Sequence, residues 1–151
     1  MLDIAVPDFK LPATGEKLFQ LSAERGHPLL LYFYPKDSTP GCTTEAAQFR
    51  DLHEQFDKLG CRIYGISRDS MKSHENFKAK LALPFDLLSD SEEIACKLFA
   101  VIKLKKMYGK EVRGIERSTF LIDAVGILRR EWRALKADGH AAEVLSAVES
   151  L

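Results

Sequence analysis

Cys42 stands where a thiol could act as a nucleophile. It follows the turn-forming stretch YPKDSTPG, residues 34–41, and directly precedes a segment with helical periodicity. At the start of a helix, free backbone N–H groups and the positive end of the helix dipole favour a thiolate over a thiol. The thiolate is the nucleophilic form of cysteine, and a nearby cation favours it further. The sequence therefore predicts that Cys42 is a reactive residue.

Arg117 is the cation that could accompany this thiolate. It lies in the otherwise apolar run IERSTFLID, residues 115–123, which we interpret as a strand. A buried guanidinium needs an anionic partner, because burying an unpaired charge is costly. A thiolate at the end of a neighbouring strand could be that partner, and a structural carboxylate such as Glu45 or Glu111 is the alternative.

Thr39 and two prolines complete the candidate site. Thr39 lies three residues before Cys42, and its hydroxyl can both donate and accept a hydrogen bond, which suits a substrate with an O–H group beside a second oxygen. Pro35 and Pro40 bracket the turn and lack N–H donors, so they can shield the sulfur from water. Each residue alone has an ordinary structural explanation; their combination favours a functional site.

The surrounding pattern predicts the elements that would position these residues. The apolar run at residues 29–34 is typical of a strand buried on both faces. Apolar residues then recur at helical spacing over 43–59, and Gly60 ends that helix. Further strands are predicted at 61–67, 85–89, 114–123 and 126–132, further helices at 71–82, 92–101 and 138–151, and an exposed loop at 103–113.

This order predicts one α/β domain over residues 1–151, with a mixed sheet flanked by helices on both faces. The pattern suits a thioredoxin-like architecture, and other α/β folds remain open on the pattern alone. In open α/β sheets, sites form outside the carboxyl ends of the strands, which is where residues 29–34 lead to Cys42.

Composition excludes several classes of function. Basic and acidic residues balance at 22 each, so nothing indicates binding to nucleic acid or to an anionic membrane. No apolar stretch approaches the ~20 residues of a membrane span. The opening MLDIAVPDF lacks the pattern of a secretory signal. The three cysteines form no CxxC motif and suggest free thiols in a reducing compartment, so we expect a cytoplasmic protein.

The histidines give no sign of a metal site. His27, His53, His74 and His140 are scattered without the spacing of metal ligands, so we expect no metal.

The segment FYPKDSTPGCTTEAAQFRD resembles the active-site segment of the peroxiredoxins, in the alkyl hydroperoxide reductase–thiol-specific antioxidant family. The chain is similar to their bacterioferritin-comigratory-protein, or Q-type, branch over nearly its whole length. The matching segments are, in order, VPDF, LLLYFYP, YGISRDS, FDLLSD, KMYGKEVRGIERSTFLID and GILRREW. The spacing P-x-x-x-T-x-x-C with a downstream arginine is the specific part of this resemblance.

The resemblance implies a thioredoxin fold and a cofactor-free thiol peroxidase active in antioxidant defence. Carried over to the matching positions, Cys42 would be the peroxidatic cysteine and become a sulfenic acid. Thr39 would hydrogen-bond the peroxide, and Pro35 would shield the thiolate. Arg117 would stabilise the thiolate and the charge that develops on the peroxide oxygens. Members of the branch are often monomers, so a monomer or a weak dimer is expected.

The sequence departs from the family pattern at the resolving cysteine. Many members carry one five residues after the peroxidatic cysteine, where this chain has Ala47. Cys61 is expected to be buried and inert. Cys96 falls near the edge of its helix's apolar face, could be partly exposed, and could form a disulfide with Cys42 after local unfolding. The preferred alternative is a one-cysteine mechanism, in which glutathione, glutaredoxin or thioredoxin supplies the resolving thiol.

Other interpretations stay open at this point. Oxidation of Cys42 could switch a partner interaction in a redox sensor or holdase, with little turnover. A thioredoxin-fold binding module with a decayed site is disfavoured by the intact set of residues, and a disulfide oxidoreductase by the missing CxxC. The basic stretch KLKKMYGK, residues 103–110, is either a solvated loop or a docking site for an acidic reductant.

Overall fold

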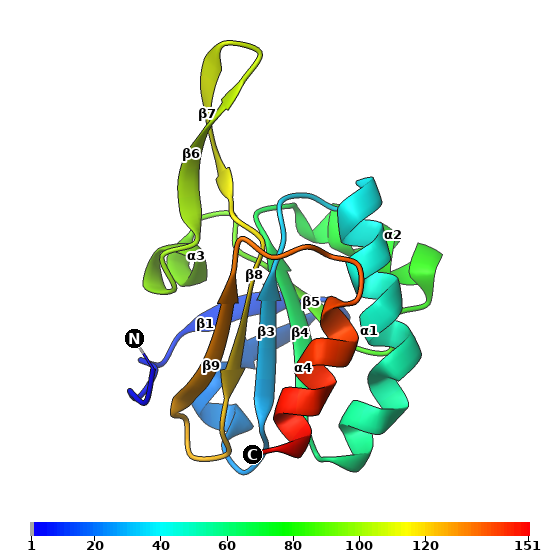
Figure 1. Ribbon diagram of the computed structural model, residues 1–151. Coiled ribbons are helices and arrows are strands. Elements are labelled where there is room, and N and C mark those ends of the chain that lie inside the picture. The colour runs from blue at the N-terminus through cyan, green and yellow to red at the C-terminus, as the bar shows by residue number, and fades with distance from the viewer. Residues whose placement is uncertain (1) are drawn as a thin grey trace.

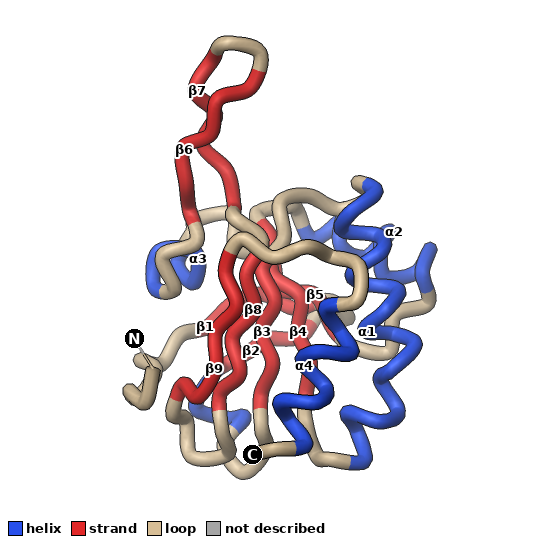
Figure 2. The backbone as a smooth tube through the Cα atoms, viewed as in Figure 1, coloured by secondary structure: helices blue, strands red, loops and turns tan. Residues whose placement is uncertain are grey.

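The computed structural model describes residues 2–151, apart from the side chain of Met107. Its elements are arranged in a seven-stranded sheet, a separate hairpin and helices packed against the sheet (Figures 1 and 2). The strands are β1 (Lys10–Ala13), β2 (Lys17–Gln20), β3 (Leu29–Phe33), β4 (Arg62–Ser67), β5 (Asp86–Ser89), β6 (Ile102–Met107), β7 (Lys110–Ile115), β8 (Ser118–Ile122) and β9 (Leu128–Arg133). The helices are η1 (Leu21–Glu24), α1 (Pro40–Lys58), α2 (Met71–Leu81), α3 (Ile94–Leu98) and α4 (His140–Glu149).

The main sheet is mixed. Its strand order is β2-β1-β5-β4-β3-β8-β9. The pairs β3–β4 and β4–β5 are parallel, whereas β3–β8 and β8–β9 are antiparallel. All five residues of β3 are buried, as expected of a strand with neighbours on both sides and helices over its faces. The mixed sheet predicted from the sequence is confirmed.

Two hydrophobic layers hold the sheet, one on each face. Side chains of α1, α2 and α4 pack on the face that carries Leu30 and Tyr32. Side chains of α3 and of the N-terminal segment pack on the face that carries Leu31 and Phe33. Figure 1 shows α1, α2 and α4 grouped on one side of the sheet and α3 on the other. The prediction that helices flank the sheet on both faces is therefore confirmed.

Local sequence accounts for the helix ends. Pro40 occupies the first turn of α1, where its missing N–H costs nothing. Gly60 follows the helix with a φ of 70°, a left-handed conformation that glycine adopts without strain. The Ser70 side chain caps α2 by accepting a hydrogen bond from the backbone N–H of Ser73 at 3.2 Å. Asp90 accepts hydrogen bonds from the N–H groups of Ile94 and Cys96 at the start of α3.

Several predicted elements were wrong in extent or type. Residues 103–113, expected as a loop, form most of the β6–β7 hairpin. The described side chains between residues 103 and 113 are exposed on both faces of the ribbon, so this stretch lacks the apolar alternation that marks a half-buried strand. The single strand expected over 114–123 is divided between β7 and β8, and the helix expected over 92–101 is only α3. The strands β1 and β2 were not predicted.

Candidate active site

Cys42 lies in the first turn of α1, as the sequence predicted. Its side chain is 1% exposed. The first backbone hydrogen bond of the helix runs from the N–H of Thr43 to the carbonyl of Thr39 at 2.9 Å, so the N–H groups of Gly41 and Cys42 precede the helical ladder. The N-cap residue Thr39 makes no side-chain hydrogen bond to the helix. These N–H groups are therefore available to stabilise negative charge close to the sulfur.

Arg117 contacts the sulfur directly. Its Nη2 lies 3.4 Å from Cys42 Sγ, and its Nη1 donates to Glu45 Oε1 at 2.7 Å. Of the two carboxylates considered from the sequence, Glu45 is thus the partner, whereas Glu111 lies on the β6–β7 hairpin. Contrary to the prediction, Arg117 is not inside a strand but in the short segment between β7 and β8. That segment lets its side chain turn towards α1 while the backbone enters the sheet.

Gly41 gives the guanidinium room to pass. A Cβ atom at this position would lie 3.0 Å from Nη2 of Arg117, closer than carbon and nitrogen atoms normally approach without a hydrogen bond. The glycine permits this close approach, and its φ lies outside the left-handed region. From the sequence, Gly41 had been noted only as part of a turn.

Glu45 is fully buried beneath the arginine. Its Oε1 is paired, and its Oε2 has no hydrogen-bond partner among the described residues. Burial raises the pKa of Glu45 to about 7, although the charge and hydrogen bond of Arg117 act to lower it. Burial also acts to lower the pKa of Arg117, but the charges of Glu45 and Cys42 outweigh it and raise that pKa. The arginine therefore remains a cation beside the sulfur.

The two turn residues predicted for the site differ in how the structure places them. Thr39 is the half-buried N-cap of α1, and its hydroxyl donates to the carbonyl of Lys36 at 2.8 Å. Because the proton is used in this bond, the lone pairs of the hydroxyl oxygen are left to accept from a visiting O–H group. Pro35 is exposed and directly follows the buried Tyr34. Among the described residues, Pro35 lies outside the buried hydrophobic cluster that contains Cys42.

A buried hydrogen-bond network anchors the turn that carries these residues, and no sequence motif had predicted it. Asp37 Oδ1 accepts from the hydroxyl of Tyr34 at 2.6 Å, and Oδ2 accepts from Ser73 at 2.8 Å. His74 Nδ1 lies 2.7 Å from the same Oδ2, and its Nε2 lies 2.9 Å from the carbonyl oxygen of Leu88. Both ring nitrogens thus face oxygen atoms that can accept a hydrogen bond, a carboxylate oxygen and a backbone carbonyl oxygen.

The pKa of Asp37 reflects these contacts. Burial acts to raise the pKa of Asp37, but hydrogen bonds from His74 and Tyr34 outweigh it and lower that pKa. Asp37 belongs to the turn before α1, and His74 lies on α2. The contact between Asp37 and His74 therefore ties the turn to the neighbouring helix. In the sequence, only the segments KDSTPGC and SHENF, which carry Asp37 and His74, could have pointed to this pair.

Asp69 extends the network. Its Oδ2 accepts from the backbone N–H of Asp37 at 2.8 Å and from the hydroxyl of Ser67 at 2.6 Å. One oxygen or nitrogen from each of Asp37, Asp69 and His74 lies within 4.8 Å of the other two, a spacing that could also suit a metal ion. Asp37 and His74 contact each other, and Asp69 accepts from Ser67 and from the backbone of Asp37, so the cluster is explained as a network that positions the turn.

The other two cysteines are buried. Cys96 is 0% exposed, which corrects the expectation of partial exposure at a helix edge. Burial, with a smaller effect of Asp90, raises the pKa of its thiol. Cys96 belongs to the hydrophobic cluster on the α3 face of the sheet, whereas Cys42 belongs to the cluster on the α1 face. Cys61 is 2% exposed, and burial raises the pKa of its thiol to about 12, so it is buried as predicted.

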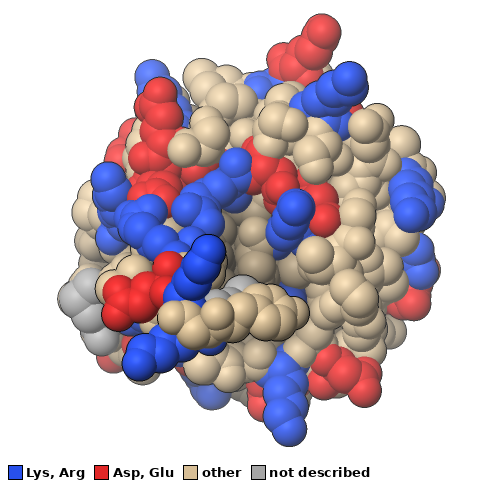
Figure 3. Space-filling view, turned by 90° about the horizontal axis from the view of Figure 1, so that it is seen from above, with Lys and Arg blue, Asp and Glu red and all other residues tan. Residues whose placement is uncertain are grey.

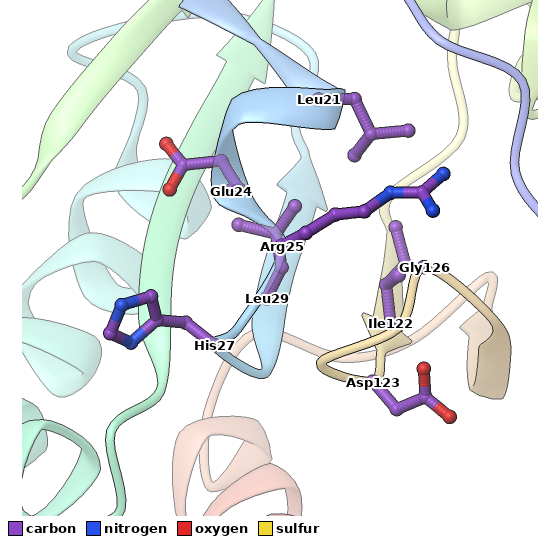
Figure 4. Close-up of a pocket in the computed structure, with 8 residues that line it drawn as sticks. All are labelled: Leu21, Glu24, Arg25, His27, Leu29, Ile122, Asp123 and Gly126. Atoms are coloured by element: carbon purple, nitrogen blue, oxygen red, sulfur yellow. The ribbon is translucent and has the colours of Figure 1, made fainter.

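A crevice elsewhere in the molecule is not a second candidate. It lies between η1 and the turn from β8 to β9 and holds about 10 Å³, enough for about one water molecule. Figure 4 shows that the side chains of Glu24 and His27 point away from Arg25, so the charged groups do not converge. Its lining residues are Leu21, Glu24, Arg25, His27, Leu29, Ile122, Asp123 and Gly126.

Over residues 2–151, no helix combines the length and the apolar character that crossing a bilayer requires.

The chain is similar to known proteins over most of its length. Residues 3–131 match the AhpC/TSA family. The chain is 52% identical over 149 residues to Peroxiredoxin Bcp of Xanthomonas campestris, with 99% of this chain and 93% of that protein covered. A structure of the bacterioferritin comigratory protein of the same organism has 51% identity and a TM-score of 0.90, covering 94% of this chain and 90% of that one. A mutant of Xylella fastidiosa PrxQ has 43% identity and a TM-score of 0.95, covering 99% and 96%.

These similarities extend over nearly the whole chain and confirm the thioredoxin-like fold that the sequence predicted. The identity is far above the level at which likeness would reflect the fold alone. The chain therefore belongs to the AhpC/TSA family, in its Bcp/PrxQ branch of peroxiredoxins, and is a thiol-dependent peroxidase.

Proposed function

We propose that this chain reduces hydrogen peroxide and alkyl hydroperoxides to water and alcohols through a sulfenic acid on Cys42. The observation that carries the proposal is the contact between Arg117 Nη2 and Cys42 Sγ, 3.4 Å apart, in the first turn of a helix. Alkyl peroxide reduction is an activity of the similar Xanthomonas campestris bacterioferritin comigratory protein, which supports alkyl hydroperoxides as substrates here.

The chemical step uses charge that is in place before the substrate arrives. The Cys42 thiolate attacks one oxygen of R–O–O–H, an S–O bond forms, and the O–O bond breaks with its electron pair leaving on RO⁻. A proton from solvent converts RO⁻ to ROH, and Cys42 is left as the sulfenic acid. Arg117 and the first-turn N–H groups of α1 stabilise the negative charge as it moves from sulfur to oxygen.

Thr39 and Pro35 have roles in positioning the peroxide. The Thr39 hydroxyl donates to the carbonyl of Lys36, so its oxygen is ready to accept the O–H of the substrate. Pro35 lacks an N–H group and follows β3, so it limits how water can solvate the entrance. Both roles follow from the family resemblance and are compatible with these positions.

The sulfenic acid is resolved by a thiol from outside the chain. An external thiol attacks the Cys42 sulfur to give a mixed disulfide and water, and a second thiol releases Cys42 as a new disulfide forms. Thioredoxin, glutaredoxin and glutathione supply such thiols. The burial of Cys96 on the opposite face of the sheet argues against the alternative, a Cys42–Cys96 disulfide. Bringing those sulfurs together would require α1 or α3 to unfold locally.

The proposed oligomeric state and compartment rest on two further observations. Cys42, Arg117 and Glu45 come from one chain, so the site needs no partner subunit and a monomer or weak dimer is sufficient. The three free cysteines suit a reducing compartment, which favours the cytoplasm and a part in antioxidant defence and redox homeostasis.

Intact mass after one equivalent of hydrogen peroxide, without reductant, tests the mechanism. Gain of one oxygen, trapped by dimedone and absent in Cys42→Ser, is the expected result. Loss of two hydrogens in the wild type but not in Cys96→Ser would instead establish the Cys42–Cys96 disulfide. Oxidation of Cys42→Ser at the wild-type rate would refute Cys42 as the peroxidatic residue.

A further inference from the structure

The hairpin of β6 and β7, residues 102–115, stands apart from the main sheet; we refer to it as the basic arm. Its two strands pair only with each other. Figure 1 shows it projecting from the end of the sheet at which β3 leads to α1. A two-stranded ribbon without a packed face has little stability of its own. The exposed side chains of the arm are therefore free to serve a partner without disturbing the core.

The charges of the arm are mostly of one sign. Five of its side chains are basic and one, Glu111, is acidic, in a chain whose total charge is zero. The pairing Lys105↔Val112 and Met107↔Lys110 places Lys103, Lys105 and Lys110 on the same face of the ribbon. No ion pair involves these three lysines within residues 2–151. Figure 3, which views this end of the molecule, shows basic side chains gathered beside the projecting hairpin.

Exposed apolar groups accompany these charges. Leu104 is 68% exposed, Tyr108 at the tip is 99% exposed, and Val112, on the lysine face, is 42% exposed. An aromatic side chain and aliphatic groups next to unpaired cations are the composition of a protein-binding surface rather than of a purely solvated loop.

The base of the arm is fixed beside the reactive sulfur. Arg113 and Arg68 both pair with Glu93, and Arg68 also donates to the carbonyl of Arg113 at 3.2 Å. The chain then runs from β7 through Glu116 into Arg117, whose Nη2 is 3.4 Å from Cys42 Sγ. A protein held by the arm is thus held close to the residue that contacts the sulfur.

We propose that the basic arm docks an acidic dithiol protein that reduces oxidised Cys42. This inference rests on the proposed function and specifies the reductant. The dithiol attacks the Cys42 sulfenic acid, forming a mixed disulfide and releasing water; its second thiol then forms its own disulfide and releases the Cys42 thiol. Because Cys42 is 1% exposed, a bulky reductant gains from a contact that holds it at the entrance. Charge complementarity would mainly raise the association rate.

The test compares two variants with the same change in net charge. The arm variant reverses the three lysines of the basic face: Lys103→Glu, Lys105→Glu and Lys110→Glu. The control reverses three exposed lysines on β1, α1 and α2: Lys10→Glu, Lys58→Glu and Lys80→Glu. Cys42 is first oxidised with peroxide, and its reduction is then followed by stopped-flow with an acidic thioredoxin or with dithiothreitol.

The arm variant should be reduced by the acidic thioredoxin about tenfold more slowly than the wild type at low salt. The control should change little, and reduction by dithiothreitol should be the same in all three. The wild-type rate with thioredoxin should also fall as ionic strength rises from about 20 mM to about 300 mM, where charges are screened.

Other outcomes would overturn the proposal separately from the proposed function. An unchanged thioredoxin rate in the arm variant, or an equal fall in the control, would refute docking at the arm. A lower mass in solution for the arm variant alone would assign the arm to a second copy of this chain instead. Absence of peroxide oxidation at Cys42, with no turnover even in dithiothreitol, would refute the proposed function itself.

Discussion

Replacing Glu45 by glutamine should remove a pH dependence from the stability of the folded chain. Glu45 is 0% exposed, and burial raises its pKa from the ordinary 4.5 to about 7. At about 1.4 kcal/mol per pKa unit, this rise corresponds to about 3 kcal/mol. The amide of the Glu45→Gln variant would keep an oxygen that can accept from Arg117 Nη1 but would carry no charge.

The sign follows from proton binding. Between about pH 4.5 and pH 7 the folded chain holds a proton at Glu45 that the unfolded chain has lost. The free energy of unfolding therefore falls as pH rises through this window, and the penalty is complete above it. The free energy of unfolding of the wild type, minus that of Glu45→Gln, should fall by about 3 kcal/mol between about pH 4 and about pH 8.

Equilibrium unfolding in denaturant, under reducing conditions and over that pH range, measures this difference. Other titrating groups are shared by both proteins and cancel. Glu54→Gln, at a glutamate on the same helix, is the control and should show a far smaller change with pH, because the Glu54 side chain is 86% exposed to water in the folded chain. A constant difference for Glu45→Gln would refute the reasoning, because it would mean that Arg117 fully offsets the burial of the carboxylate.

Three further predictions concern the surroundings of the site. Gly41→Ala should slow peroxide reduction about tenfold, because the new Cβ would lie 3.0 Å from Arg117 Nη2 and displace it. Stability in denaturant should stay the same or rise, because alanine favours the helix. An unchanged rate of peroxide reduction would show that the guanidinium moves without consequence. His74→Ala should lower the free energy of unfolding by about 1–3 kcal/mol, because it leaves the buried Asp37 carboxylate and the carbonyl of Leu88 without this hydrogen-bond partner. An unchanged free energy of unfolding would contradict the role of His74 in holding the turn. Cys61, 2% exposed with its pKa raised to about 12, should react with iodoacetamide only after denaturation, as peptide mapping would establish.

The elements around the site were predictable because their signals are local. The uninterrupted apolar run of β3 and the helical spacing of apolar residues in α1 each depend on neighbouring residues only. Gly60 and Ser70 mark helix ends for equally local reasons. The β6–β7 hairpin was missed because its described side chains between residues 103 and 113 are exposed on both faces, so that stretch of the sequence carries no burial pattern.

For the site, the residue types near Cys42 indicated the chemistry, and the need of a buried Arg117 for an anion indicated a partner. The choice between Glu45 and Glu111 could not be made from the sequence, because it depends on how α1 packs beside the segment before β8. The exposure of Cys96 was misjudged because one helix's periodicity does not report what the N-terminal segment covers.

Short-range patterns and motif spacing in the sequence were thus enough to establish most of the strands and helices near the site, the thiol at a helix start and the family. Three other facts came only from the folded chain: Arg117 touches both Cys42 and Glu45, His74 contacts Asp37, and Cys96 lies across the sheet from the reactive sulfur. These facts join residues far apart in the chain, and their energies depend on burial and distance, which no local pattern contains.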